Sequence, residues 1–295
     1  MANLKEVKSR IQSVTSTQQI TKAMKMVAAA KLKRAQDNIT EMRPYAQKLT
    51  NMLQNLSSQQ EEGDETGVYT ELRDVKKVLL VVVTSDKGLC GAFNSNIFKA
   101  TIKHIKDNYP VLFDKGQVDI LPVGKKSLDY FTKRDYNVIG DYWDMFSPVD
   151  FEKSNDIALF AMEKFAGKEY DKVEIIYNEF KNVATQILQV EQFLPILPSD
   201  DVADSKFEVD YIFQPSRDEI VKDLMPKSLK IQIFKAILES NAAEHGARMT
   251  AMDQATDNAG ELLKELKLTY NRTRQAAITT EILEIVAGAE ALGSS

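Results

Sequence analysis

The sequence predicts an α/β protein: a long antiparallel coiled coil of N- and C-terminal helices plus a central three-layer, Rossmann-like α/β domain. Two observations lead to this prediction. Apolar residues recur every 3.5 residues through Leu4–Leu56, and a similar seam follows Ser216. Such a seam is typical of a helix that packs along another helix. Between the two seams, β-branched runs alternate with helical patterns, which indicates a largely parallel sheet.

The first helix is the most regular part of the chain. Asn3 with Glu6 forms a capping box at its start, and no glycine interrupts it. At 1.5 Å per residue it would be roughly 80 Å long, and it needs a partner helix to be stable. Its seam consists of Leu4, Val7, Ile11, Val14, Gln18, Thr21, Lys25, Ala28, Leu32, Ala35, Ile39, Met42, Ala46, Leu49, Leu53 and Leu56.

The last helix supplies that partner. Ser216 with Glu219 forms a second capping box. Each seam is interrupted by a short polar gap, which in the first helix is Gln18, Thr21 and Lys25. If the ends of the two helices near residues 57 and 216 lie level, Lys25 faces Arg248 and the two polar gaps lie side by side. The second seam is Leu224, Ile231, Phe234, Leu238, Met252, Ala255, Ala259, Leu262, Leu266, Ala276, Leu283 and Ala287, with Asn241, His245 and Arg248 as its gap.

The same register leaves the chain beyond about Tyr270 without a partner helix. Apolar residues in this overhang, including Ile278, Ile282 and Ile285, cover most of the helix circumference. A helix that is apolar all round is normally buried. We therefore expect another protein to cover it.

The predicted organisation is a shaft helix at 1–57, an acidic linker at 58–75, an α/β domain at 76–215 and a second shaft helix at 216–295. Within the domain we expect a hairpin turn at Lys181 and Asn182. The expected strands are Lys76–Asp86, Gln117–Val123, Tyr136–Ile139, Lys172–Phe180, Ala184–Leu194 and Phe207–Phe213, and the expected helices run to about Asn108, from Lys125, and over about Val149–Phe165.

Charge and composition narrow the classes of function. The net charge is −5, yet residues 1–57 hold ten Lys or Arg against three Asp or Glu. This basic helix is either a solvated face or a match for an acidic protein surface, and nothing in it favours nucleic acid. No run of about 18 apolar residues suggests a membrane span. Cys90 is the single cysteine, so an internal disulfide is impossible, and the N-terminus carries no signal or presequence pattern.

The search for chemistry predicts no catalytic, cofactor-binding or metal-binding residue. Gly124–Ser127 lacks the spaced glycines of a phosphate loop. His104 and His245 have no ligand spacing, and Cys90 has no accompanying histidine. Thr84–Gly91 joins a strand to a helix, where phosphate can bind, but its residues favour a tight turn.

Several stretches resemble the gamma subunit family of F-type ATP synthases. They are SRIQSVTSTQQITKAMKMVAAAKLKRAQ (9–36), TSDKGLCGAFN (84–94) and a block over 247–291 that ends in ITTEILEIVAGAEA. The likeness covers essentially the whole chain. Phe213 and Gln214 depart from the pattern that some relatives show near the ring contact, so that contact is not transferred.

The resemblance implies a non-catalytic central-stalk rotor that couples proton or sodium flow to ATP synthesis and hydrolysis on other subunits. Its tip would turn inside three alpha and three beta subunits, and its α/β foot would bind the epsilon subunit and the membrane c-ring. The resemblance also implies a bacterial protein, peripheral on the cytoplasmic face of the inner membrane. The alternative is a static coiled-coil tether whose α/β domain binds a small ligand. Partner contacts are expected at Met24, Lys25, Arg248, Arg274, Gln275, Ile278, Ile282 and Ile285.

Overall fold

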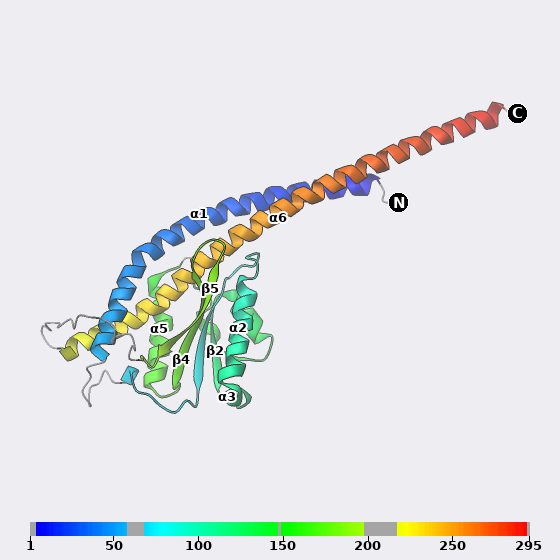
Figure 1. The fold of residues 1–295 in the computed structure, drawn as a ribbon. Coiled ribbons are helices and arrows are strands. Elements are labelled where there is room, and N and C mark those ends of the chain that lie inside the picture. The colour runs from blue at the N-terminus through cyan, green and yellow to red at the C-terminus, as the bar shows by residue number, and fades with distance from the viewer. Residues whose placement is uncertain (1–3, 58–67, 147–148, 198–216, 294–295) are drawn as a thin grey trace. The chain divides into compact units, whose positions relative to one another are not determined.

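A computed structural model describes residues 4–57, 68–146, 149–197 and 217–293 (Figure 1). The chain divides into two compact units, one of residues 29–248 and one of residues 1–28 with 249–295. Two long helices, α1 (Leu4–Ser57) and α6 (Arg217–Gly293), contribute to both units.

The larger unit contains a five-stranded sheet in the order β3-β2-β1-β4-β5. β1 pairs in parallel with β2 and β4, β2 pairs in parallel with β3, and β5 runs antiparallel to β4. Every residue of β1 and β2 is buried, as expected for parallel strands that are covered on both faces. The strands are β1 (Val78–Val83), β2 (Val118–Val123), β3 (Asn137–Val138), β4 (Lys172–Phe180) and β5 (Gln186–Leu194).

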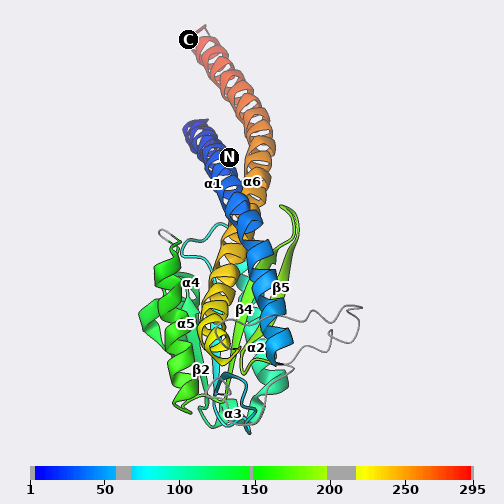
Figure 2. The ribbon, with the colours of Figure 1, turned by 90° about the vertical axis from the view of Figure 1, so that its left-hand side faces the viewer.

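Helices cover both faces of this sheet, so the predicted three-layer α/β class is confirmed (Figures 1 and 2). On one face lie α2 and α4, which bury Ile97, Ile105 and Phe131. On the other lie α5 and the beginning of α6. The shorter helices are α2 (Phe93–Asn108), α3 (Pro110–Asp114), α4 (Lys125–Thr132), the 3₁₀ turn η2 (Gly140–Tyr142) and α5 (Phe151–Ala166).

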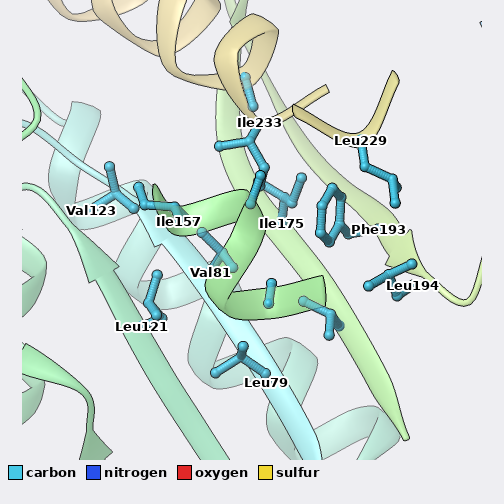
Figure 3. Packing of buried hydrophobic residues seen from close by; sticks show 14 of the residues in the cluster. Leu79, Val81, Leu121, Val123, Ile157, Ile175, Phe193, Leu194, Leu229 and Ile233 are labelled. Carbon is cyan, nitrogen blue, oxygen red and sulfur yellow. The ribbon is translucent and has the colours of Figure 1, made fainter. Parts of the chain in front are cut away.

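The main core joins side chains that are far apart in the sequence. Figure 3 shows Val81 and Ile175 of the sheet, Ile157 of α5 and Ile233 of α6 converging in one apolar cluster. Because Leu229, Ile233, Ala236 and Ile237 are all buried in this cluster, the first part of α6 forms a wall of the α/β core.

Most of the predicted elements of this unit are present. β4 has the expected bounds, and Asn182 closes the β4–β5 hairpin by accepting hydrogen bonds from the backbone N–H groups of Ala184 and Thr185. The short helices α3 and η2 have no periodic pattern, because five and three residues are too few to show one. The expected strand at Phe207–Phe213 lies outside the described residues.

The segment from Val68 to Lys77 lies against the α/β core. The carbonyl of Tyr69 accepts a hydrogen bond from Ile196 N at 2.8 Å. Arg73 donates to the carbonyl of Phe165 and stacks over that residue's ring at 4.2 Å. The second half of the stretch that composition marks as linker is therefore packed on the domain.

In the smaller unit, α1 and α6 pair through a seam that includes Val7, Thr21 and Ala28 of α1, all buried. On α6 the buried residues are Met252, Ala259 and Leu263. Leu262, expected in the seam, is exposed instead. One residue is 100° around a helix, so counting strictly by threes and fours placed the seam on the wrong leucine.

The predicted register is wrong by about one helical turn. The hydroxyls of Thr21 and Thr256 lie 2.8 Å apart, whereas level helix ends would place Thr21 opposite Met252. Lys25 pairs with Asp253 and not with Arg248. The error comes from the assumption of level ends, because apolar seams tolerate a shift of one turn and only the polar pairs distinguish the two registers.

Within the larger unit, a bidentate ion pair joins α1 to α6. Arg43 Nε and Nη2 donate to the two carboxylate oxygens of Glu239 at 2.7 and 2.9 Å, and Nη2 also donates to the carbonyl of Phe180. Glu239 accepts a further bond from Phe180 N. Its side chain is only 1% exposed, against 46% for Arg43, so the carboxylate depends on these donors for its solvation.

Arg43→Ala should therefore lower the free energy of unfolding by about 2–4 kcal/mol, because a buried carboxylate loses its counter-ion while partial exposure lets some water replace it. Lys33→Ala is the matched control, since the Lys33–Asp37 pair lies on the surface and such pairs contribute about 0.3–0.5 kcal/mol. Chemical unfolding followed by circular dichroism gives both values. Equal losses in the two variants would show that the Glu239 pair adds no more than a surface pair.

Candidate partner-binding surfaces

The last part of α6 exposes a group of large apolar side chains, which we call the apolar tip: Ile278, Ile282, Leu283, Ile285 and Val286. Ile282 is 55% exposed and Ile285 66%. From Asn271 to Ala289 every side chain except that of Thr273 is exposed. The segment is nonetheless helical, and the hydroxyls of Thr279 and Thr280 bond the carbonyls four residues before them. It offers its apolar surface to solvent on several sides.

Five of the predicted contact residues belong to this segment. Gln275, Ile278, Ile282 and Ile285 follow one another by three and four, so they share one face of the helix, and Arg274 lies beside them. All five are exposed. The helix thus brings these residues together on one continuous surface.

Met24 and Lys25 lie on α1 in the same unit, and both are half-buried. Lys25 is held by Asp253. The more exposed apolar residues of this part of α1 are Ile20, Met26 and Val27. The predicted contact residues do not include them, because they lie off the seam. Apolar residues at non-seam positions were the available sequence signal for this exposed apolar face.

Arg248 belongs to the other unit and has a different environment. Its Nη1 donates to Glu244 Oε1 at 2.5 Å, and its Nη2 donates to the carbonyls of Lys87 and Gly88 at 2.9 and 3.2 Å. Its side chain is 12% exposed. Arg248 is therefore turned toward the β1–α2 loop of its own chain.

The neighbours of Arg248 are buried and titratable. Burial raises the pKa of Glu244, an effect that Arg248 opposes. Burial, followed by the charges of Arg248 and Lys31, lowers the pKa of His245 to about 4. His245 is thus neutral at pH 7, and its Nδ1 lies 3.4 Å from Arg248 Nη1, where it can accept a hydrogen bond.

The start of α4 does not offer free N–H groups to a phosphate. Lys125 N donates to Asp86 Oδ1, Lys126 N to the carbonyl of Ser85, and Ser127 N to Thr84 Oγ1. Gly124 has φ +109°, and a Cβ there would lie 2.2 Å from the Thr84 carbonyl oxygen. Glycine at this position therefore allows close packing against Thr84, directly after β1, and the Asp86 carboxylate would repel an anion.

The remaining candidates are engaged in structural contacts. His104 Nε2 lies 2.6 Å from Glu174, which Lys172 also contacts at 2.9 Å. Cys90 is buried, and burial raises its thiol pKa. Within the described ranges, no group of three or more His, Cys, Asp or Glu side chains could hold a metal ion. Of the helices in those ranges, none has the length and apolarity to cross a bilayer.

The lowered pKa of His245 predicts a loss of stability in acid. As the pH falls below about 6.5 the unfolded chain binds the proton first, so stability that is complete near pH 7 is lost progressively down to about pH 4. At about 1.4 kcal/mol per pKa unit the loss approaches 3 kcal/mol. His245→Gln should lose that much less between pH 7 and pH 4 in chemical unfolding. A parallel decline in both proteins would contradict the assignment.

Comparison with known proteins gives a consistent result over the whole chain. A family model described as ATP synthase matches residues 3–292. The ATP synthase gamma chain of Cytophaga hutchinsonii is 56% identical over 296 residues, covering 100% of both chains. That of Flavobacterium johnsoniae is 59% identical over 292 residues, covering 99% of both.

Solved structures have the same fold. The central stalk and c-ring structure of Tetrahymena thermophila mitochondrial ATP synthase contains a chain with a TM-score of 0.58 and 27% identity, covering 80% of this chain and 99% of that one. The rotor of the Euglena gracilis mitochondrial enzyme matches with a TM-score of 0.61 and 22% identity, covering 93% and 98%. Together with the bacterial relatives, which are more than half identical from end to end, these findings show that the chain belongs to the ATP synthase gamma chain family.

Proposed function

We propose that this chain is the central-stalk rotor of a bacterial F-type ATP synthase, coupling ion flow through a membrane ring to ATP synthesis and hydrolysis on partner subunits. The apolar tip carries this proposal. A helix that ends in exposed Ile, Leu and Val on several sides fits a sleeve of apolar protein surface, whereas the end of a static tether would be polar or flexible.

The partners follow from the family. The Tetrahymena thermophila relative belongs to a central stalk with a c-ring and the Euglena gracilis relative to a rotor. We infer that this chain likewise meets three alpha and three beta subunits, an epsilon subunit and a c-ring. Arg274, Gln275, Ile278, Ile282 and Ile285 would lie against the alpha and beta subunits. The +7 charge of residues 1–57 suits acidic surfaces on those partners.

The place of action also follows from the family. The relatives compared above come from bacteria, so we propose that this chain works at the cytoplasmic face of the inner membrane as a peripheral part of the complex. The coupling ion is a proton or sodium.

We further propose that the chain is not itself catalytic. Folds of this kind bind nucleotides beyond the carboxyl ends of the strands. Beyond the end of β1, Asp86 and Thr84 already accept hydrogen bonds from the backbone N–H groups at the start of α4. Nucleotide chemistry would then take place on the alpha and beta subunits, and this chain would alter nucleotide affinity there by its orientation.

Two paired substitutions test whether the apolar tip lies in an apolar sleeve of partner protein, which we call the bearing. Ile282→Leu with Ile285→Leu keeps volume and apolarity and should preserve assembly and ATP hydrolysis, because a sleeve selects for apolar character. Ile282→Asp with Ile285→Asp would bury two carboxylates at a cost of several kcal/mol, so complex yield or turnover should fall about tenfold or more. Reconstitution with alpha and beta subunits measures both. Equal behaviour of the two pairs would exclude an apolar bearing and favour the tether.

The non-catalytic role is tested on the pure chain. Calorimetric titration with Mg-ATP should give no saturable heat, because the backbone N–H groups at the start of α4 already have acceptors. The complex reconstituted from the same preparation supplies the positive control for ATP binding. Stoichiometric binding to the isolated chain would show that it carries a nucleotide site of its own.

A further inference from the structure

Both terminal nitrogens of the Arg248 guanidinium are engaged by groups of its own chain. It bonds Glu244 one turn earlier on α6, lies beside His245, and donates to two successive carbonyls of the β1–α2 loop. We call residues 86–90 of this loop the β1 loop. A side chain that is 12% exposed and holds four acceptors has little capacity left for another molecule.

The β1 loop contains a conformation that its sequence alone does not favour. Leu89 has φ +63°, a left-handed value that crowds Cβ against the backbone in any residue except glycine. Its side chain is 65% exposed, so burial of the leucine side chain does not offset the cost of this backbone conformation. Such a conformation persists only where the surroundings impose it, and the bonds from Arg248 to Lys87 and Gly88, immediately before Leu89, are suitably placed to do so.

Ser85 and Asn94 also bond the loop. Ser85 Oγ donates to the carbonyl of Lys87 at 2.7 Å, and Asn94 Nδ2 donates to Ser85 Oγ and to Cys90 Sγ. The carbonyl of Lys87 thus accepts from Ser85 and from Arg248. In contrast, the carbonyl of Gly88 has Arg248 as its donor.

The position of this contact in the sheet is informative. β1 lies between β2 and β4, where the strand order reverses and where folds of this kind bind ligands beyond the strand ends. Here α6 occupies that end: a Cβ on Gly246 would lie 3.3 Å from the ring of Phe180, the last residue of β4. Arg248 follows two residues later and reaches the loop after β1.

We propose that Arg248 is a positioning residue: with Glu244 it forms a latch that holds the β1 loop on α6 and keeps Leu89 in its exposed, left-handed conformation. The contribution of Arg248 to the family's function is then the shape of this loop and not a direct contact with a partner subunit. This inference concerns the chain by itself and stands whether or not the proposed rotor role does.

Cys90 reports on the latch. It is the only cysteine, it is 2% exposed, and it follows Leu89, so a maleimide reaches it only when the loop opens. Arg248→Lys keeps a cation beside Glu244 but lacks the planar fork that bonds both carbonyls. We expect N-ethylmaleimide to label Cys90 about tenfold faster in this variant, equivalent to about 1.4 kcal/mol of latch stability.

Arg34→Ala is the matched control, because Arg34 is an exposed arginine of the same unit, and it should label at the wild-type rate. Leu89→Asn tests the strain, since asparagine tolerates the left-handed region. In that background the effect of Arg248→Lys should shrink to about threefold or less, because less strain then opens the loop.

Three results would overturn the proposal. The first is wild-type labelling of Arg248→Lys. The second is an undiminished effect of Arg248→Lys in the Leu89→Asn background. The third comes from amide hydrogen exchange: the latch predicts faster exchange confined to residues 86–91, whereas faster exchange throughout the α/β unit, or failure of the variant to fold, would show that Arg248 gives only general structural support.

Discussion

A parallel sheet has to be covered on both faces, and this constraint explains why the first part of α6 packs on the domain. β1 and β2 are buried at every residue, so water must be excluded from both sides. α2 and α4 cover one side, while α5 covers only part of the other. Leu229, Ile233, Ala236 and Ile237 of α6 complete the second layer. The helix that continues into the coiled coil is therefore also an integral part of the domain core.

Polar contacts of α6 follow directly after the residues that it contributes to the core. Glu239 receives Arg43 and Phe180 N, and Glu244 receives Arg248. Both carboxylates are buried and each has a guanidinium partner, which is the arrangement that makes a buried charge tolerable. These ion pairs determine which residues of α1, β4 and the β1 loop contact α6. Apolar contacts alone would not give this specificity.

The sequence predicted the elements better than their register. The seam of α1 and the bounds of β4 could be read directly, because periodicity persists over long stretches and a buried strand is a continuous apolar run. The pairing of Thr21 with Thr256, and the burial of Leu263 in place of Leu262, could not. These depend on a shift of one turn or one residue, which changes the apolar pattern little.

The same limit applied to the candidate surfaces. Gln275, Ile278, Ile282 and Ile285 share a face because helical spacing alone determines it. The environment of Arg248 was missed for another reason: its acceptors are backbone carbonyls at Lys87 and Gly88, about 160 residues earlier. Backbone groups carry no signature in a sequence, and the left-handed Leu89 has none either.

The composition of the apolar tip has a consequence for the chain before it meets its partners. A newly made subunit exposes five large aliphatic side chains within nine residues, a patch that invites self-association. Ala276, Ala277, Ala287 and Ala289 flank this stretch, and Glu281 and Glu284 lie between its aliphatic residues. Those residues favour helix over extended structure and add like charge. Before assembly, a helical apolar tip is therefore less prone to β-aggregation than an extended segment of the same apolar residues would be.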